Sequence, residues 1–386
     1  MKSGNGKYDV IVAGAGPVGC VIADRAAREM GWKCLVLEKR SHIAGNCHDS
    51  LDENGILLHR YGPHCFRTWD KNIIDYLGTF TEWLPGNHRV RALHNGQLYP
   101  IPINLTTLEL FFGKRLTEES GRVLIEQKRS DIKDPKNSEE IVLSKVGREL
   151  FEAFYRGYTQ KQWGMDACEL APSVCGRVPV RLNRDDRYVD ETYQCMPKEG
   201  YTALFQKMLR HPLIDVRLNS DYLRQRESLQ ANLAIVYTGP VDAYFDYCYG
   251  QLPYRSLEFE WILSEKEFDQ PCLAINYPSN HEFTRSVEIK HVTGQKHLKS
   301  VIALEYPRSK GEPFYPIPTD KNFGLYEQYR RLAEIETEAN GVYFCGRLAT
   351  YNYLNIDVAI QNALSLHERI KRRHSSSHAV DRSTSL

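Results

Sequence analysis

Apolar and polar positions follow a clear order near the start of the chain. Residues 8–13 (YDVIVA) form an apolar run of strand length, residues 20–30 carry apolar side chains at helical spacing, and residues 33–37 form a second apolar run. A glycine-rich turn, GAGPVG, lies between the first run and the helical stretch. This order predicts a strand, a helix and a second strand parallel to the first.

The pattern changes farther along the chain. Residues 106–162 are charged and helix-forming, with apolar positions three and four apart, which predicts a helical domain. Residues 177–197 and 252–318 alternate β-forming side chains with prolines, which predicts an antiparallel sheet. Residues 231–240 and 341–346 are again apolar runs that end in glycine turns, and we expect both to return to the first sheet.

These patterns together predict an α/β protein with a Rossmann-like nucleotide-binding domain, an inserted helical domain and an antiparallel β-sheet domain. The chain has 386 residues, more than the ~100–200 that usually form one domain. The expected boundaries are 1–85, 196–245 and 319–372 for the nucleotide-binding domain, 104–166 for the helical domain, 86–103, 167–195 and 246–318 for the sheet domain, and 373–386 for a Ser-rich flexible tail.

The charges of the chain nearly cancel, since 50 Lys and Arg residues stand against 49 Asp and Glu residues. No overall field is therefore available to hold nucleic acid or an anionic membrane, and an anionic ligand must meet local arginines. No apolar stretch is long enough to span a membrane, and the N-terminus lacks the apolar segment of a signal peptide. We therefore expect a cytoplasmic protein without membrane or nucleic-acid partners.

The ten cysteines are scattered, and no two of them form a C-x-x-C pair. Such spacing is not that of a zinc site or of a small domain held together by disulfides. We expect buried or half-buried free thiols and no metal.

The glycine turn has the spacing G-x-G-x-x-G, and its glycines suit three physical tasks. Gly14 permits a tight turn, Gly16 lets the backbone approach a pyrophosphate, and Gly19 lets the helix lie close to the strand. Glu38 ends the second apolar run, where a carboxylate can accept hydrogen bonds from a ribose. Between a strand and a helix, and followed by this acid, the turn predicts dinucleotide binding rather than a chance glycine-rich turn.

The residues after Glu38 favour FAD over NAD. A basic pair, Lys39 and Arg40, precedes a second glycine turn that ends at Gly45 and Asn46, as in FAD-binding proteins of the glutathione-reductase type. No second G-x-G-x-x-G follows, so the sequence shows no domain for a nicotinamide that would reduce the flavin. Such a flavoprotein either takes electrons from a separate donor or uses its flavin without net electron transfer.

Several stretches, taken together and in order, match one family. They are GAGPVG, LEKRSHIAGN, HRYGPHCFRT, YPIPIN, GYTQKQWG, RVPVR, YTGPVDAYFDY, YRSLEFE, FTRSVEIKH, EPFYPIP and GRLATYNYLNI, over about residues 8–365. On these residues the chain resembles the UDP-galactopyranose mutases of the prokaryotic type. The resemblance implies an isomerase that interconverts UDP-galactopyranose and UDP-galactofuranose for polysaccharide biosynthesis, with FAD that is active when reduced and no net redox change.

Ring contraction of a nucleotide sugar requires that the bond between the anomeric carbon and the diphosphate break while something holds the sugar. The resemblance implies that N5 of the reduced flavin attacks the anomeric carbon, so that the cofactor supplies the nucleophile. The protein then has to orient the sugar, stabilise charge and exclude water. The resemblance also implies an external reductant for the FAD and a homodimer.

The leaving diphosphate gains negative charge as its bond to the sugar breaks, and guanidinium groups suit that charge. Arg177 and Arg285 match the two diphosphate arginines of the family, although each would otherwise be a simple surface ion-pair partner. His64 lies in the segment that runs beside the flavin in this family, although a lone histidine is more often a packed or surface residue. We predict catalytic roles for Arg177, Arg285, His64 and Arg67.

Uracil recognition needs flat faces, which GYTQKQWG and the helical turn before it offer. Aromatic residues at helical spacing more often belong to a core, and the family match reverses that preference. Tyrosine hydroxyls can also donate to a diphosphate without adding charge. The residues predicted to bind substrate are Phe154, Tyr158, Thr159, Trp163, Tyr188, Tyr315, Tyr353 and Asn355.

The resemblance also places the cofactor on the glycine turns, the ribose acid, the histidine segment and the C-terminal GRLATYNYLNI. The residues predicted to bind FAD are Gly14, Gly16, Pro17, Val18, Gly19, Glu38, Lys39, Arg40, Gly45, Asn46, Tyr61, His64, Thr238, Gly239, Gly346, Arg347, Tyr353, Asn355 and Ile356.

The chain departs from the family pattern at three positions. Arg67 stands where the family usually has a second histidine near the flavin, and we hypothesise that it changes tolerance at sugar C2, for example by admitting the N-acetyl group of UDP-N-acetylgalactosamine. Asn355 replaces an acidic residue, and Ala44 replaces the first glycine of a pair. The sequence therefore does not decide whether the sugar of the substrate is galactose or a close relative.

We also expect a mobile lid near residues 167–188 that brings Arg177 onto the diphosphate and shields the reaction from water. Two other interpretations stay open. A FAD-dependent oxidoreductase acting on another small molecule shares the nucleotide turn but needs an electron acceptor. A Rab-escort-like binding protein has a related fold without catalysis, although its phosphate turn tends to be degraded, whereas the turn here is intact.

Overall fold

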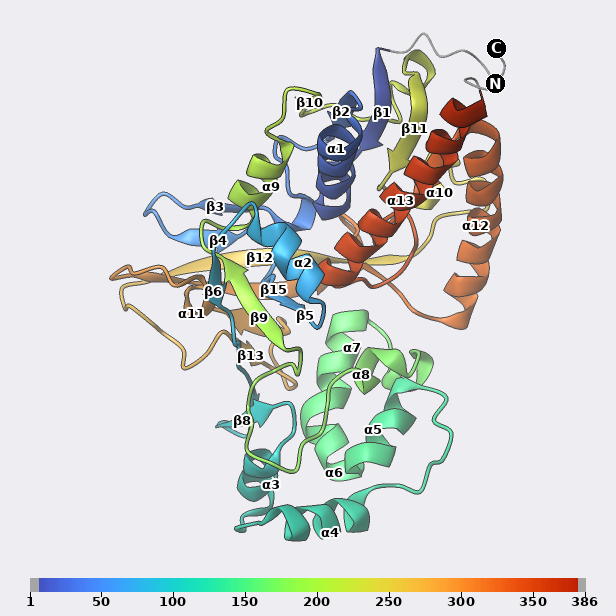
Figure 1. Cartoon of the computed structure of the whole chain (residues 1–386). Helices are drawn as coiled ribbons and strands as arrows, with labels where there is room; N and C mark the ends of the chain where they lie inside the picture. The colour runs from blue at the N-terminus through green and yellow to red at the C-terminus, as the bar shows by residue number, and fades with distance from the viewer. Residues whose placement is uncertain (1–6, 381–386) are drawn as a thin grey trace.

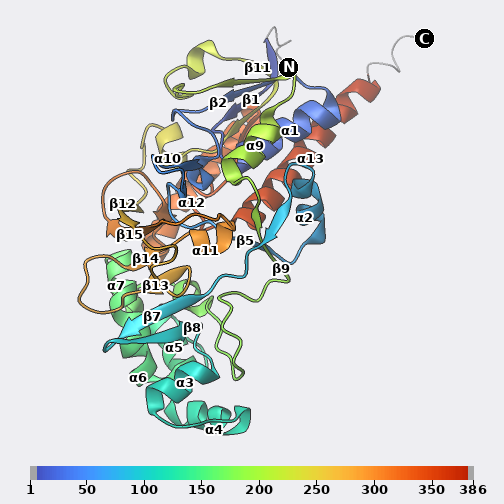
Figure 2. The same cartoon turned by 90° about the vertical axis from the view of Figure 1, so that its left-hand side faces the viewer.

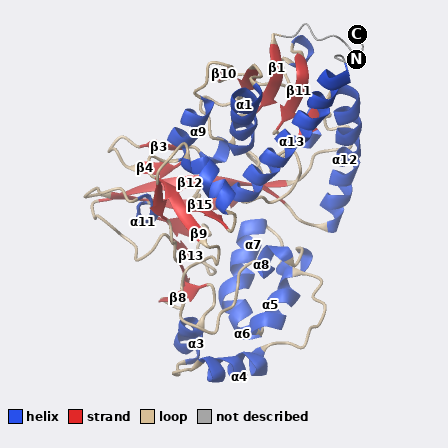
Figure 3. Cartoon of the chain, in the orientation of Figure 1, coloured by secondary structure: helices blue, strands red, loops and turns tan. Residues whose placement is uncertain are grey.

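The structure, a computed structural model, describes residues 7–380 of the chain. Three units follow one another along the molecule (Figure 1): a parallel sheet flanked by helices, an antiparallel sheet, and a group of short helices. The view from the side places the short helices at the end of the molecule opposite the parallel sheet (Figure 2). Colouring by secondary structure shows that strands dominate the middle of the molecule, between two mainly helical regions (Figure 3).

The parallel sheet has the strand order β10-β2-β1-β11-β17. Its strands are β1 (Tyr8–Ala13), β2 (Cys34–Leu37), β10 (Ile214–Arg217), β11 (Ala231–Tyr237) and β17 (Val342–Phe344). Helix α1 (Pro17–Met30) connects β1 to β2, so the predicted strand, helix and parallel strand are confirmed. The helix begins earlier than the apolar spacing suggested, because Pro17 can occupy the first helical turn without losing a hydrogen bond.

Helices pack against this sheet and complete its core. α1, α9 (Tyr201–Leu209) and α13 (Ile356–Val380) lie together on one side (Figure 1). Side chains of β1 alternate, so that Val10 and Val12 belong to the core under α1 and Ile11 belongs to a second cluster. α12 (Asp320–Asn340) packs against β17 and α10 (Val241–Tyr244).

The larger sheet has the order β16-β12-β15-β14-β13-β7-β8. Its strands are β7 (Val90–His94), β8 (Gln97–Ile101), β12 (Tyr254–Ser264), β13 (Ala274–Asn276), β14 (Arg285–Val287), β15 (Ser300–Arg308) and β16 (Tyr315–Pro316). Its neighbours are antiparallel, as expected, except that β13 pairs parallel to β7. That pair joins two distant parts of the chain, so no tight turn fixes its direction.

The helical unit contains α3 (Leu105–Phe112), α4 (Glu118–Lys128), α5 (Ser138–Val146), α6 (Arg148–Leu150), a π-helical turn (Phe151–Arg156), α7 (Gly157–Trp163), a 3₁₀ turn (Ala167–Glu169) and α8 (Ser173–Gly176). The last two pack against α5, so residues 167–176 belong with the helices and not, as expected, with the sheet. The remaining elements are α2 (Lys71–Gly78), α11 (Lys290–Thr293), the β3–β4 pair (Asp49–Leu51, Leu57–His59) and 3₁₀ turns at Gly45–Cys47 and Arg226–Ser228.

The expectation of strand structure over residues 177–197 is wrong for most of that segment. Only β9 (Tyr193–Pro197) forms, and it pairs with β5 (Phe66–Thr68) and β6 (Trp83–Pro85) in a separate small sheet. Before β9, individual backbone contacts replace a ladder: the Arg181 N–H donates to the carbonyl of Ile103 at 2.9 Å. Buried backbone groups need partners, and here single contacts to neighbouring segments supply them.

The structure also bears on the expected tail boundary and on the expected state of the cysteines. α13 continues to Val380, past the expected start of the tail at residue 373, because a helix once formed gains one bond for each residue added; residues 381–386 lie outside the described residues. All ten cysteines are free, although Cys168 and Cys248 are exposed. Within residues 7–380, no helix combines the length and apolar character needed to cross a membrane.

Candidate active site

The glycine turn has the geometry that its spacing predicts. Gly14 has φ +115°, and a Cβ there would lie 2.0 Å from Oγ1 of Thr238. A Cβ on Gly19 would lie 1.9 Å from the carbonyl oxygen of Gly14, so only glycine lets α1 approach the strand this closely. Gly16 is the N-cap of α1, whose first N–H groups stay available to an anion.

Glu38 ends β2 beside this turn and is 5% exposed. Its carboxylate accepts hydrogen bonds from the N–H groups of Ala15, at 2.8 Å, and Arg40, at 2.9 Å. The acid therefore fixes the glycine turn to the end of β2. Each carboxylate oxygen retains a further acceptor position for a ribose hydroxyl.

A cavity of about 1010 Å³ opens over these carboxyl-terminal strand ends. It is lined by sixteen of the residues predicted to bind FAD: Gly14, Gly16, Pro17, Val18, Glu38, Lys39, Arg40, Gly45, Asn46, His64, Thr238, Gly239, Gly346, Arg347, Asn355 and Ile356. Gly19, Tyr61 and Tyr353 lie outside this lining. The cavity is at the upper end of the usual size of ligand pockets, and its glycine cradle suits an extended dinucleotide.

Some residues that line the cavity were not predicted from the sequence. Ser220, Asp221, Tyr222 and Leu223 follow β10 and line it. β10 pairs with β2, so the loop after it reaches the same sheet edge as Glu38. Arg40 also crosses to the antiparallel unit, where it pairs with Glu312, and its guanidinium lies 4.5 Å from the centre of the Tyr61 ring.

Arginines and tyrosines gather beside the cavity. The guanidinium carbon of Arg177 lies 4.6 Å from the centre of the Tyr353 ring, and that of Arg347 lies 5.0 Å from it. Tyr353 stacks on Tyr315 with 5.4 Å between ring centres. Desolvation works against ionisation of Tyr353, but Arg177 and Arg347 outweigh it and lower its pKa to about 8.

Arg285 approaches this group from the first position of β14. Its Nε donates to Glu305 at 2.6 Å, and Glu305 is fully buried. Burial alone would lower the pKa of Arg285, but the carboxylate of Glu305 outweighs it and raises that pKa well above the ordinary value. Arg285 therefore stays charged and has a fixed direction, while its other nitrogen donors remain available for an anion.

The predicted uracil residues occupy α7 and the turn before it. Tyr158 is half-buried, and burial, only partly offset by Arg285, raises its pKa to about 12. Trp163 is 7% exposed, with its ring centre 6.4 Å from that of Tyr315. Thr159 and Phe154 are buried, and Phe154 packs against Tyr99 of β8 at 5.1 Å between ring centres, so it contributes mainly to the core between the helical unit and the larger sheet.

His64 lines the cavity and is neutral. Burial lowers its pKa to about 3. Its Nδ1 lies 2.8 Å from the carbonyl of Gly62, which can only accept, so Nε2 is left as an acceptor. The backbone N–H of His64 donates to Nδ1 of His59 at 3.1 Å, which anchors the turn that carries it.

Arg67 pairs with Glu191 at 3.0 Å, so its charge is partly neutralised. His88, a residue to which we assigned no role, is 9% exposed, and its ring centre lies 5.3 Å from that of Tyr188. Burial and then Arg67 lower the pKa of His88 to about 4. Tyr188 is half-buried and donates its backbone N–H to the carbonyl of His88. A neutral, buried imidazole thus lies against Tyr188.

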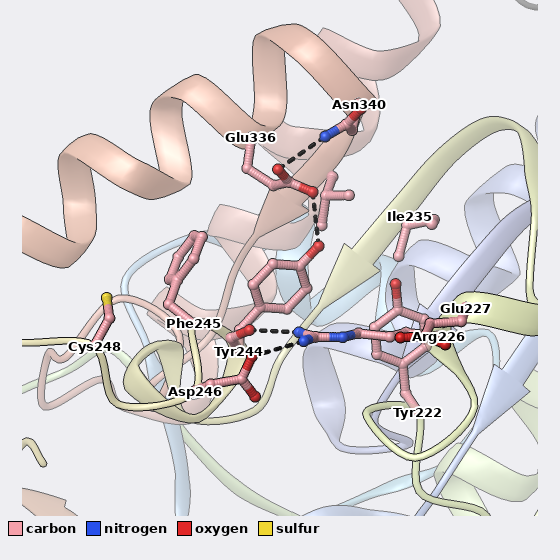
Figure 4. A pocket seen from close by; sticks show the side chains of 11 residues that line it. Tyr222, Arg226, Glu227, Ile235, Tyr244, Phe245, Asp246, Cys248, Glu336 and Asn340 are labelled. Carbon is pink, nitrogen blue, oxygen red and sulfur yellow. Dashed lines mark hydrogen bonds and ion pairs between the residues drawn. The ribbon is translucent and has the colours of Figure 1, made fainter.

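A second hollow, of about 500 Å³, shares Tyr222 with the large cavity but is lined by none of the predicted site residues (Figure 4). Three of its charged side chains pair with neighbouring groups, and among them Arg226 donates to the carbonyl of Tyr244 at 2.6 Å and to Asp246 at 2.8 Å. Glu336 accepts from the Tyr244 hydroxyl and from Asn340, both at 2.9 Å. Because these polar groups pair with one another, the hollow lacks the converging arginines that lie beside the large cavity.

A glycine-built dinucleotide cavity beside converging arginines and tyrosines defines an enzyme that handles a phosphorylated substrate next to a nucleotide cofactor. The family model described as UDP-galactopyranose mutase matches residues 153–353, and that described as NAD(P)-binding Rossmann-like domain matches residues 12–80. The chain belongs to the UDP-galactopyranose mutase family and is an enzyme of the isomerase class.

Its relatives extend along nearly the whole chain. It is 39% identical over 363 residues to a probable UDP-galactopyranose mutase of Klebsiella pneumoniae, covering 92% of this chain and 93% of that protein. It is 36% identical over 366 residues to a dTDP-fucopyranose mutase of Escherichia coli, covering 92% and 96%. A crystal structure of reduced UDP-galactopyranose mutase has the same fold, with a TM-score of 0.74 at 17% identity over 94% of this chain and 95% of that one.

These comparisons confirm the predicted family, fold class and isomerase activity. They decide against an unrelated oxidoreductase and against a binding protein without catalysis.

Proposed function

We propose that this enzyme interconverts the pyranose and furanose forms of a nucleoside-diphosphate sugar, with UDP-galactose as the first candidate, and that FAD in its reduced form occupies the large cavity. One observation carries the proposal: Arg177 and Arg347 flank Tyr353 next to the cavity that His64 lines, so an anion-binding cluster adjoins a dinucleotide site.

The bound flavin would supply the nucleophile that holds the sugar while the diphosphate is detached. Arg177 and Arg285 bind the diphosphate and stabilise the charge that grows on it. Tyr353 and Tyr315 donate hydrogen bonds to its oxygens without adding charge. Tyr158 and Trp163 orient the base, and His64 offers Nε2 as an acceptor near the reacting sugar.

Closure of a lid near residues 167–188 remains part of the proposal. Arg177 lies in this segment, and its guanidinium lies over the ring of Tyr353. Beyond it, Asp186 pairs with Arg89 at 2.7 Å and with Arg91 at 2.6 Å, which ties one end of the segment to β7. We expect UDP to protect the segment from proteolysis, whereas equal cleavage with and without UDP would count against closure.

The sugar and the base are the finer questions. The relatives are named for UDP-galactopyranose and dTDP-fucopyranose, so the candidates differ in a methyl group on the base, in the 2′-hydroxyl of the ribose and in the substituent at C6 of the sugar. Arg67 adds a third candidate, UDP-N-acetylgalactosamine, if it admits a larger group at C2. Its pairing with Glu191 favours a role in shaping the pocket over direct stabilisation of an anionic flavin.

The test is chemical. FAD-loaded protein, reduced with dithionite, is incubated with UDP-galactopyranose, dTDP-fucopyranose or UDP-N-acetylgalactosamine, and the products are separated by chromatography. We expect a furanose product with no reductant consumed beyond the first reduction, and none from oxidised protein. Conversion that consumes reductant in proportion to product would contradict the proposal. The ratio of rates for the galactose and N-acetylgalactosamine substrates in Arg67→His then tests the role of Arg67.

The setting of the reaction is also proposed from the family. We infer a cytoplasmic homodimer that acts in polysaccharide biosynthesis and draws electrons from an external reductant. Sedimentation of the FAD-loaded protein tests the dimer, and a monomer over the whole concentration range would contradict it.

A further inference from the structure

Two basic side chains attach helix α7 to the antiparallel sheet. Lys161 extends from the helix into the loop of residues 277–284, which connects β13 to β14. Arg255 extends from β12 to the C-terminal end of the same helix. Neither residue has a role in the chemistry described above.

The ammonium of Lys161 sits among four backbone carbonyls of that loop. Nζ donates to the carbonyl oxygens of Ser279 and His281 at 2.9 Å, to that of Phe283 at 3.1 Å, and to that of Tyr277. An ammonium has three N–H donors, so the four acceptors share them. Carbonyl dipoles that converge on one point repel one another unless a cation lies there. The loop conformation therefore depends on this charge.

The backbone of α7 also touches the loop directly. A Cβ on Gly157 would lie 2.0 Å from the carbonyl oxygen of Pro278, so any larger residue would push the helix and the loop apart. At the other end, Arg255 Nε donates to the carbonyl of Gln162 at 2.9 Å and its Nη2 to that of Lys161 at 3.3 Å. These are carbonyls of the last helical turn, which lack partners within the helix and favour a cation.

The loop leads directly to the diphosphate arginine. Arg285 is the first residue of β14 and pairs with Asn276 at the end of β13. The Tyr277 N–H donates to the carbonyl of Thr284 at 2.8 Å, which closes the base of the loop. A helix held against this loop is therefore held at a fixed distance from Arg285. That helix carries Tyr158 and Trp163, the proposed base-binding residues.

We propose that Lys161 is a positioning residue that, together with Gly157 and Arg255, sets the separation between the base-binding face of α7 and Arg285. The joint allows one nucleoside diphosphate to reach both sides of the cleft at once. The inference rests on the proposed function, because it assumes that α7 holds the base and Arg285 the diphosphate. It adds that their spacing is maintained by a lysine that touches neither group.

The experiment uses FAD-loaded Lys161→Met and Gly157→Ala, which act on the joint by different means. Methionine keeps most of the length of the lysine side chain without its charge, whereas Gly157→Ala keeps the charge of Lys161 and inserts one methyl group. We expect both to weaken UDP binding about tenfold or more in calorimetry and to raise KM more than they lower kcat. Inhibition by uridine alone or by pyrophosphate alone, each bound on one side only, should stay as in the wild type.

Lys266→Met is the matched control, since Lys266 is an exposed lysine that pairs with Asp269 after β12, away from the joint. It should bind FAD and UDP as the wild type does. Lys161→Arg tests whether charge alone suffices: partial recovery of UDP affinity relative to methionine supports the joint.

The outcomes separate the inference from the function on which it rests. Failure of the wild-type protein to bind UDP would overturn the proposed function. Wild-type affinity for UDP in Lys161→Met would overturn the inference alone. If that variant does not fold, Gly157→Ala decides, and normal UDP binding there would overturn the inference. Loss of FAD and UDP together in both variants would also overturn it, in favour of a general structural role.

Discussion

The proposed cofactor cavity and the proposed substrate cleft lie side by side but are built by different means. The cavity takes its shape from backbone, where Gly14 and Gly19 leave no room for a side chain. The cleft is formed by side chains that three separate segments supply, among them Arg177, Arg285 and Tyr353. A site formed by backbone fails as a whole when one atom is added, whereas a site formed by side chains loses activity in steps.

The strongest test of this contrast is a single added methyl group. Gly19→Ala should prevent stable cofactor binding and lower the free energy of unfolding by about 2 kcal/mol or more, because the new Cβ meets the Gly14 carbonyl at 1.9 Å. Gly324→Ala makes the same change in α12 with nothing within 4 Å, and should be neutral or stabilise by up to about 1 kcal/mol. Visible absorbance of the purified proteins and thermal unfolding measure both. Normal flavin content in Gly19→Ala would remove the contrast.

Arg177→Ala tests the side-chain site. We expect kcat/KM to fall by about 10²–10³ while the flavin spectrum and content stay unchanged, because a charged donor to the leaving diphosphate is lost. Arg184→Ala, which removes an exposed arginine paired with Glu109, should have no effect. Loss of flavin from Arg177→Ala would show that the two sites are not independent.

The pH dependence of UDP affinity should report Tyr353. Below its pKa of about 8 the phenol donates to the diphosphate, and above it the phenolate repels the diphosphate, so affinity should fall by up to about tenfold per pH unit above pH 8. Tyr353→Phe should bind more weakly but without this fall. Tyr315→Phe should keep it, because burial and Tyr353 raise the pKa of Tyr315 out of this range. Calorimetry at a series of pH values decides, and a flat wild-type profile would contradict the assignment.

The smallest effect is expected from an exposed ion pair at the edge of the cavity. Glu312 pairs with Arg40 across the edge of the cavity, and its side chain is 48% exposed, so the pair is well screened. Glu312→Gln should weaken FAD binding about threefold at most, and less at high salt. Glu258→Gln, which breaks a comparable pair with Arg308, should leave FAD affinity unchanged. A larger loss would mean that the cavity also depends on side chains.

The same contrast explains what the sequence could predict. The turn from Gly14 to Gly19 and the acid at Glu38 lie at fixed spacings within one βαβ unit, so local pattern was enough to predict the fold of that unit and its ligand class. The roles of Arg177 and Arg285 could be predicted only from the family resemblance, because nothing near them in sequence distinguishes an arginine that binds a diphosphate from one in a surface ion pair.

Other features depend on contacts that no local pattern records. The loop after β10 reaches the cavity because β10 pairs with β2, and that pairing is a matter of topology. Lys161 lies inside a motif that carried the resemblance, yet its partners are backbone carbonyls of residues 277–283, which any sequence could supply. The segment before β9 resembled a strand because its composition suits one, but Pro179 has no N–H to donate to a ladder, and only single backbone contacts form there.

The interleaved order of the parallel sheet also bears on how the protein is made. β1 pairs with β11, β11 pairs with β17, and α1 packs on α13. The first strand and helix therefore lack some of their partners until segments much later in the chain have been synthesised. Gly346 and Arg347 complete the cavity. A nascent chain therefore cannot capture its flavin until these last segments have left the ribosome, and until then the early strands must be kept from aggregating.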